Sequence, residues 1–257
     1  MKTWSAAMIV IVSLVCSANI TKAEETIRFA TEAAFPPFNE RAPDGSIVGF
    51  EIDLGMAMCA RINRKCEFIA QEWEGMIPGL LTKKFDGIFA SMSITEERKK
   101  KIDFTSKYYE SGGVFVALKG IGIDVADTRL GGKTIGTLSG STYFCYLEKK
   151  YPEATVTPYP NADALYLDLS SGRLDAIFAD AVATDFGFLR TERGEEMALA
   201  SEIVSERDCF GEGAGIGLRK EDTALRDKLN QAIVDVRADG TYQALAKKYF
   251  EYDIYGD

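Results

Sequence analysis

Hydroxyl side chains and one arginine gather in the stretch SMSITEER, residues 91–98, directly after the apolar run at 87–90. Ser93 and Glu96 have the spacing of a capping box, which predicts that a helix begins here and presents free backbone N–H groups. Arg98 adds a guanidinium whose parallel donors match a carboxylate. The pattern therefore indicates a clamp for a small acid. The alternative is that the hydroxyls only cap a helix and that Arg98 lies in solvent.

Carboxylates and aromatic rings at other predicted strand ends supply the other half of a site. Glu32 follows the first predicted strand and Asp180 follows a later one, so both carboxylates are expected to face a common cleft. Phe35 and Trp73 lie just beyond strand ends. A carboxylate beside aromatic rings suits a ligand with an alkyl chain and a cationic end. Two alternatives remain: the rings are ordinary core, or the paired acids serve an enzyme in which one carboxyl is a general acid.

A second turn of small residues, 139–142, follows the strand-like run 134–138 and permits close approach of backbone to a ligand. Other glycine-rich segments lack the spacing of nucleotide-binding loops. The run at 131–134 resembles the end of a phosphate-binding loop but precedes a strand, and the glycines at 211–217 recur at every second position. A nucleotide site is therefore not expected.

Composition excludes several classes of site and partner. The 257 residues include no histidine, so Ser-His-Asp and Cys-His catalytic groups and histidine-ligated zinc are excluded. A net charge of −9 argues against nucleic acid or anionic membrane as a partner, because both attract basic surfaces. No cofactor and no metal ion are expected.

Predicted strands and helices alternate in two similar series. The segments 84–90 and 173–179 have similar sequences, KFDGIFA and RLDAIFA, which indicates two lobes with the same arrangement of strands and helices. This order predicts an α/β fold in which each lobe is a mostly parallel sheet flanked by helices. The C-terminal third is expected to return to the first lobe, so that two crossover segments, 109–114 and 205–213, form a hinge beside a cleft. The predicted strands are 26–31, 66–71, 85–90, 134–138, 155–159, 174–179 and 215–218, and the predicted helices are 53–63, 73–83, 142–151, 162–170, 223–237 and one ending near 250.

The first 23 residues are typical of an export signal, because Lys2 precedes an apolar run and small residues surround a cleavage site after Ala23. The domain division that follows assigns 1–23 to the signal, 24–110 to the first part of lobe 1, 111–205 to lobe 2, and 206–257 to the hinge return and the second part of lobe 1.

Four cysteines follow the signal. In an oxidising compartment Cys59 and Cys66 are close enough in sequence to close a short loop between a helix and a strand. Cys145 and Cys209 either pair or remain buried thiols, and the sequence leaves both open.

Short sequence segments along the chain match those of a known protein family. They comprise GFEIDL at 49–54, the spaced cysteines at 59 and 66, IP at 77–78, the stretch 91–98, GST at 140–142, GLRK at 217–220, DGTY at 239–242 and KKYF at 247–250. On these residues the chain resembles, from residue 26 to residue 257, the periplasmic solute-binding proteins (family 3) of polar amino-acid ABC importers. The resemblance is greatest to the lysine/arginine/ornithine-binding and histidine-binding proteins. It implies the type II periplasmic-binding-protein fold, closure of the lobes on a ligand, and a disulfide between the cysteines at 59 and 66.

The resemblance also implies how the main-chain groups of an amino acid are held. Arg98 is expected to bind the α-carboxylate, helped by the backbone amides of Ser93 and Thr142. Asp180 and Ser91 are expected to hold the α-ammonium.

At the other end of the cleft, Glu32 is expected to meet a distal cation, with Phe35 and Trp73 on either side of the alkyl chain and Ser141 adding polar contacts. No residue is expected to be catalytic. The full set of expected ligand-binding residues is Glu32, Phe35, Trp73, Ser91, Met92, Ser93, Arg98, Leu138, Ser141, Thr142, Tyr143 and Asp180.

Several positions depart from the lysine/arginine/ornithine pattern. Glu32 replaces aspartate, Phe35 replaces tyrosine, Trp73 replaces phenylalanine, Ala90 replaces serine and Tyr143 replaces glutamine. Glu32 shortens the space for a distal cation, while Trp73 widens the stacking face and favours a planar guanidinium. A glutamate and a tryptophan at these positions also resemble opine-binding relatives.

The implied function is capture of a cationic L-amino acid, namely arginine, lysine, ornithine or histidine, by a monomeric periplasmic protein. The ligand would then pass to the permease subunits of an ABC importer, without catalysis. Three alternatives remain. They are a binding protein for an opine or other modified amino acid, a dehydratase built on the same lobes, and the ligand-sensing domain of a receptor.

Overall fold

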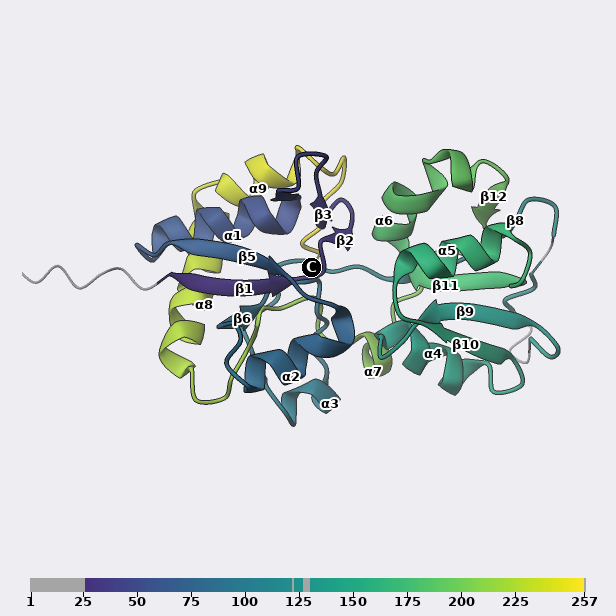
Figure 1. Cartoon of the computed structure of the whole chain (residues 1–257), viewed down its shortest axis with the longest axis horizontal. Helices are drawn as coiled ribbons and strands as arrows, with labels where there is room; N and C mark the ends of the chain where they lie inside the picture. The colour runs from purple at the N-terminus through teal and green to yellow at the C-terminus, as the bar shows by residue number, and fades with distance from the viewer. Residues whose placement is uncertain (1–25, 122, 127–129, 257) are drawn as a thin grey trace, which may run out of the picture.

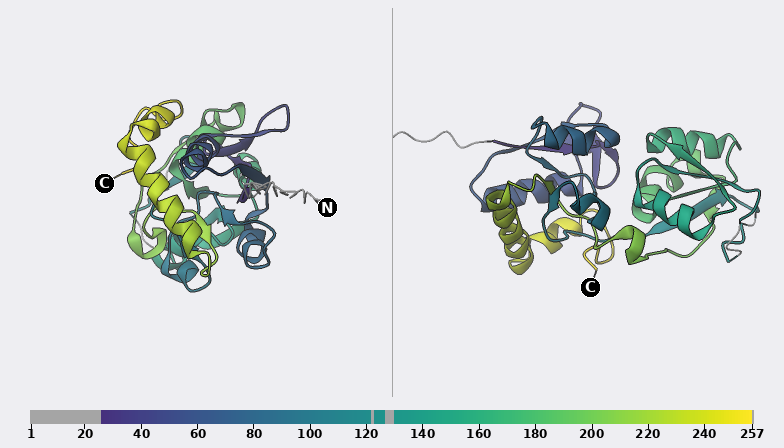
Figure 2. Two further views of the ribbon diagram at one scale, coloured as in Figure 1. Left: turned by 90° about the vertical axis from the view of Figure 1, so that its left-hand side faces the viewer. Right: turned by 90° about the horizontal axis from the view of Figure 1, so that it is seen from below.

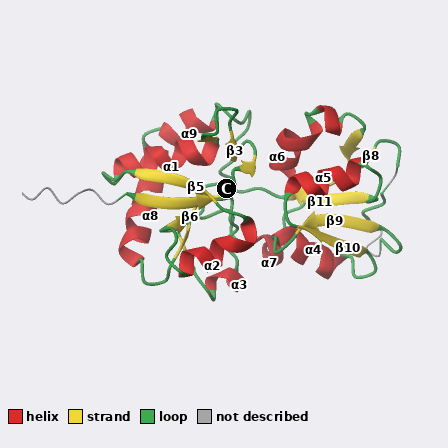
Figure 3. Cartoon of the chain, viewed as in Figure 1, coloured by secondary structure: helices red, strands yellow, loops and turns green. Residues whose placement is uncertain are grey.

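A computed structural model describes residues 26–121, 123–126 and 130–256. The expected export signal at 1–23 lies outside the described residues. Two sheet-rich lobes stand side by side, joined by extended segments (Figure 1). In each lobe helices flank the strands (Figure 3), so the predicted α/β class is confirmed. Within the described part of the chain, no helix has the length and apolar character needed to cross a membrane.

The sheet of lobe 1 has the strand order β5-β1-β6-β13-β7. β1 pairs in parallel with both β5 and β6, whereas β13 is antiparallel to β6 and β7. Because β13 comes from the C-terminal third, the chain ends in the lobe where it began. The strands are β1 (Ile27–Thr31), β5 (Cys66–Ala70), β6 (Gly87–Ile88), β7 (Asp103–Phe104) and β13 (Gly217–Leu218).

The sheet of lobe 2 has the order β10-β9-β11-β8-β12. β9 lies parallel to β10 and β11, and β8 is antiparallel to β11 and β12. Every residue of β11 is buried, as expected for a central strand that is covered on both faces. The strands are β8 (Gly113–Leu118), β9 (Thr134–Leu138), β10 (Thr155–Tyr159), β11 (Ala176–Asp180) and β12 (Met197–Leu199).

Helices cover both sheets, and a small antiparallel sheet is added to lobe 1. The buried face of α1 and that of α8 belong to one hydrophobic cluster, so α8, from the C-terminal part of the chain, packs on the N-terminal part. The helices are α1 (Phe50–Arg61), α2 (Met76–Leu81), α3 (Glu96–Lys99), α4 (Thr142–Lys150), α5 (Ala162–Ser170), α6 (Ala181–Thr184), α7 (Arg207–Phe210), α8 (Thr223–Ala238) and α9 (Thr241–Ala246), and the small sheet comprises β2 (Ala34–Phe35), β3 (Asn39–Arg41) and β4 (Ile47–Val48).

Two crossover segments run beside each other between the lobes. The backbone of Tyr108 and Tyr109 exchanges hydrogen bonds with Ala214, and Gly113 exchanges a pair with Val204. The view from below places the lobes on either side of these segments (Figure 2, right). The return segment also contains α7, which the sequence interpretation did not include.

Both pairs of cysteines form disulfides. Cys59 of α1 joins Cys66 of β5, as expected. Cys145 of α4 joins Cys209 of α7, so of the two possibilities that the sequence left open these cysteines are paired and are not free thiols. The second disulfide ties a helix of lobe 2 to the return crossover.

Most predicted elements are present with shifted ends. Helix α1 begins at Phe50 rather than at residue 53, because Gly49 precedes it with φ of 131° and its N-terminal turn packs inward. The predicted helix 73–83 divides into a 3₁₀ turn, Trp73–Gly75, followed by α2. The strand expected at 85–90 is reduced to β6, Gly87–Ile88.

Candidate functional site

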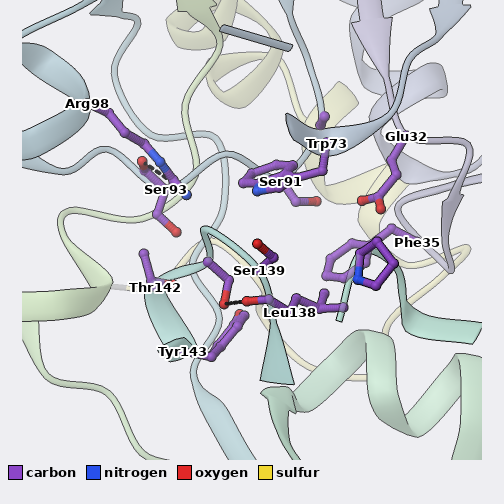
Figure 4. A pocket seen from close by; sticks show the side chains of 13 residues that line it. Glu32, Phe35, Trp73, Ser91, Ser93, Arg98, Leu138, Ser139, Thr142 and Tyr143 are labelled. Carbon is purple, nitrogen blue, oxygen red and sulfur yellow. Dashed lines mark hydrogen bonds between the residues drawn. The ribbon is translucent and has the colours of Figure 1, made fainter. Parts of the chain in front are cut away.

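A cavity opens where the two lobes face each other. Figure 4 shows Arg98 at one end and Glu32 at the other, with Trp73 and Leu138 between them. Lobe 1 supplies one wall and lobe 2 the other. The lining residues are Glu32, Phe35, Trp73, Ala90, Ser91, Ser93, Arg98, Leu138, Ser139, Ser141, Thr142, Tyr143 and Pro160.

Arg98 bridges the two lobes at one end of the cavity. Its Nη1 donates to the backbone oxygen of Ser93, 2.9 Å away, and its Nη2 donates to that of Gly140, 3.2 Å away. The guanidinium carbon lies 5.2 Å from the centre of the Trp73 ring, which is a cation–π distance. Burial lowers the pKa of Arg98 to about 10, so the group remains a cation at neutral pH.

The predicted capping box at Ser93 and Glu96 is wrong. Ser93 is held extended by a bridge to Ala214, and the helix α3 begins three residues later, at Glu96. Thr95 is the cap, and its hydroxyl accepts from the backbone N–H of Arg98 at 3.3 Å. Ser93 is therefore free to face the cavity instead of closing a helix.

The N-terminus of α4 forms the facing wall from lobe 2. Ser141 caps this helix, because its hydroxyl accepts from the backbone N–H of Phe144 at 3.2 Å. The same hydroxyl donates to the backbone oxygen of Leu138 at 2.6 Å. The next residue, Thr142, is buried. The unpaired N–H groups of a first helical turn favour negative charge, so this wall suits a carboxylate near Arg98.

The opposite end of the cavity is acidic and aromatic. Glu32 follows β1, and Phe35 belongs to β2. Burial, together with the nearby negative charges of Glu72 and Glu51, raises the pKa of Glu32 to about 7. An approaching cation would favour the ionised form of this carboxyl. This end therefore suits a positively charged group.

A second, polar cavity continues from the first toward the crossover segments. Ser91, Ser93 and Tyr143 line both cavities, and Asp180 lines the second. Asp180 is 2% exposed and caps α6 by accepting from the backbone N–H of Ala183 at 2.8 Å. The hydroxyl of Tyr143 donates to its second oxygen at 2.8 Å. Burial raises the pKa of Asp180, so this end offers an acceptor that a cation would stabilise.

The structure brings together eleven of the twelve expected ligand-binding residues, in one or other of the two cavities. Met92 is the exception, because its side chain is 1% exposed and packs in a hydrophobic cluster of lobe 1. The sequence interpretation missed the contact of Gly140 with Arg98 and the hydrogen bond from Ser139 to Glu74 at 2.8 Å, which also crosses between the lobes. Ser139 and Gly140 both follow directly after the strand β9, and this position at a strand end is the sequence feature that could have identified them.

The profile of the bacterial extracellular solute-binding proteins, family 3, matches residues 27–252. The chain belongs to this family. It is 41% identical to the lysine/arginine/ornithine-binding periplasmic protein of Escherichia coli strain K12, over 91% of this chain and 90% of that protein. It is 40% identical to the L-arginine-binding protein of Pseudomonas aeruginosa, over 91% of each chain.

Solved structures agree with this family assignment. An arginine-specific periplasmic binding protein of Salmonella typhimurium superposes with a TM-score of 0.81 at 33% identity, covering 88% of this chain and 99% of that one. The predicted two-lobed periplasmic-binding-protein fold is therefore confirmed. The relatives are binding proteins of a transport family, which also confirms the prediction that this family 3 protein is not an enzyme.

Proposed function

We propose that this family 3 protein is exported to the periplasm, captures a cationic L-amino acid, and delivers it to the permease subunits of an ABC importer. Arginine is the first candidate among arginine, lysine, ornithine and histidine. The observation that carries the proposal is the polarity of the cavity: a guanidinium at one end, a carboxylate at the other, and aromatic rings between them. An amino acid with a cationic side chain has the complementary order of charges.

The α-end of the ligand would lie beside Arg98. The guanidinium and the first turn of α4 at Thr142 would bind the α-carboxylate, since both favour negative charge. Asp180 and Ser91 would accept hydrogen bonds from the α-ammonium. The fit is supported by the continuity of the two cavities at Ser91 and Tyr143.

The side chain of the ligand would extend toward Glu32. Phe35 and Trp73 would bury its methylene groups and attract its cation. The Trp73 ring favours a planar guanidinium over an ammonium, because only the guanidinium can stack on its face. Arginine is preferred for this reason.

Lobe closure would couple binding to transport. We assign residues 24–110 to the first part of lobe 1, 111–205 to lobe 2, and 206–257 to the hinge return and the second part of lobe 1, with the signal removed near Ala23. Contacts from both lobes stabilise the closed form, so the ligand shifts the open–closed equilibrium by its differential affinity. The protein would act as a monomer, since one chain supplies both walls of the cavity.

An opine is the alternative ligand, because Glu32 and Trp73 resemble opine-binding relatives. An opine carries an additional carboxylate and needs a second cation in the site. Among the described residues that line the first cavity, between Arg98 and Glu32, Arg98 supplies the only cation. This charge balance favours a plain cationic amino acid.

Substitution of Arg98 tests the proposal. Arg98→Ala should weaken arginine binding at least about 100-fold, because a buried carboxylate would lose its charge-assisted partner. Lys99→Ala is the matched control, since Lys99 is the next residue on α3 and pairs with the exposed Glu96 and Glu212. Calorimetric affinity of the Arg98→Ala variant that equals that of the control would refute the clamp.

A further inference from the structure

A carboxylate outside the cavity is joined to it through Ser91. Glu51, in the first turn of α1, is completely buried. Its Oε1 accepts from the backbone N–H of Ser91 at 2.6 Å, from the Ser91 hydroxyl at 3.0 Å and from the hydroxyl of Tyr108. Its Oε2 accepts from Asn39 at 2.6 Å. Within the described residues no ion pair includes Glu51, so a buried carboxylate is held by neutral donors alone.

These hydrogen bonds determine what Ser91 can offer to the cavity. A serine hydroxyl has one proton to donate and two lone pairs that accept. The proton of Ser91 Oγ is directed at Glu51, and the backbone N–H of Ser91 is directed at the same oxygen. Only acceptor lone pairs remain for the two cavities that Ser91 lines. A ligand ammonium, which can only donate, is the group that such an atom selects.

The conformation of Ser91 points to the same role. Its φ is 53°, in the left-handed region that residues with a side chain rarely adopt. A second branch of the network acts on the turn beside Glu32: Asn39 donates to Glu51 and accepts from the backbone N–H of Ala33, whose φ is 57°. Glu51 thus joins two turns of lobe 1 in which a non-glycine residue has a positive φ, one at Ser91 and one beside Glu32.

We propose that Glu51 is a positioning residue that makes Ser91 Oγ a pure hydrogen-bond acceptor for the α-ammonium of the ligand. This inference rests on the proposed function, because it requires an amino acid whose ammonium lies at Ser91. Glu51 touches no ligand atom in this account. It acts through the orientation of one hydroxyl, which its Oε1 fixes by accepting from both the backbone N–H and the hydroxyl of Ser91.

The test compares two ligands that differ only in the ammonium group. They are L-arginine and 5-guanidinopentanoic acid, which lacks the α-amino group. In Glu51→Gln the amide nitrogen can donate to Ser91 Oγ, which occupies one of its lone pairs and leaves the hydroxyl proton of Ser91 to point into the cavity, against the ligand ammonium. We expect this variant to lose about 10- to 100-fold in affinity for arginine but less than about threefold for the deamino analogue. Ser91→Ala should show the same selectivity, and the double variant should lose no more than either single variant.

Control variants distinguish a positioning role of Glu51 from a general disturbance of the fold. Tyr108→Phe removes one donor to Glu51 and a hydroxyl that shares the backbone N–H of Ser91 at 3.1 Å, but it leaves both hydrogen bonds between Ser91 and Glu51. It should therefore weaken the two ligands equally and only slightly. If Glu51→Gln does not fold, Glu51→Asp makes the same test, because it draws the carboxylate back from Ser91 while keeping its charge. Equal losses for both ligands in the Glu51 variants, or no loss, would overturn the assignment. A wild-type protein that binds neither ligand would instead overturn the proposed function.

Discussion

Arginine should bind about tenfold more tightly at pH 8 than at pH 6, because Glu32 must be ionised to meet a distal cation. Burial and two neighbouring carboxylates raise the pKa of Glu32 to about 7. The sign follows from the raised pKa: the protonated form dominates below it, so binding of a cation improves as the pH rises through it. The chain has no histidine, so no imidazole titrates in this range.

The magnitude follows from the ionised fraction of Glu32. With a pKa of about 7, about one tenth of the carboxyl is ionised at pH 6 and about nine tenths at pH 8. A bound cation stabilises the ionised form, so the complex remains ionised at both values. The ratio of affinities is therefore about ten, or about 1.4 kcal/mol. At pH 6 binding should also release nearly one proton.

Calorimetry in two buffers of different ionisation enthalpy measures both the affinity and the released proton. Glu32→Gln should remove the tenfold contribution of Glu32 from the pH profile of arginine, and citrulline, the neutral isostere of arginine, should lack that contribution with the wild-type protein. Burial also raises the pKa of Asp180 and Glu51, and the Glu32 variant separates their titration from that of Glu32. A profile with the same slope in the wild type and in Glu32→Gln would refute the assignment of the distal subsite.

Two further predictions concern the disulfides and the tryptophan. Removal of Cys145–Cys209 by paired serine substitutions should lower the free energy of unfolding by about 4 kcal/mol, against about 2.5 kcal/mol for Cys59–Cys66, because the closed loops span 64 and 7 residues. Denaturant unfolding checks this order, and a larger loss for the shorter loop would contradict it. Trp73→Leu should reduce the preference for arginine over ornithine about fivefold, since the ring stacks on a planar guanidinium. Competition binding measures that ratio, and an unchanged ratio would assign the discrimination to another side chain.

Patterns that are local in sequence predicted the fold and most of the cavity wall. The strand β9 and the helices α4 and α5 begin where the alternation of apolar residues and the small-residue turns place them, to within one residue. Side chains just beyond strand ends were placed in one cavity for a geometric reason, because the carboxyl ends of parallel strands meet at one edge of a sheet.

What sequence reasoning missed depends on contacts between distant residues. Ser93 has the spacing of a helix cap, yet a bridge to Ala214, in the return crossover, holds it extended. The pairing of Cys145 with Cys209 depends on α7 packing against α4, which no local pattern reports. In the sequence Glu51 is one acidic residue near the start of a predicted helix. Its hydrogen-bond partner Ser91 lies 40 residues away, so no local pattern connects the two.

The central claim is that the cavity selects a cationic amino acid, and calorimetric titration of residues 24–257 tests it most directly. The protein should first be unfolded and refolded to remove any ligand carried through purification. We expect one site per chain, with arginine bound more tightly than lysine, ornithine or histidine and with octopine bound weakly. Heat from octopine alone would contradict this account and assign the site to opines, and no heat from any of the five would show that the cavity does not bind amino acids.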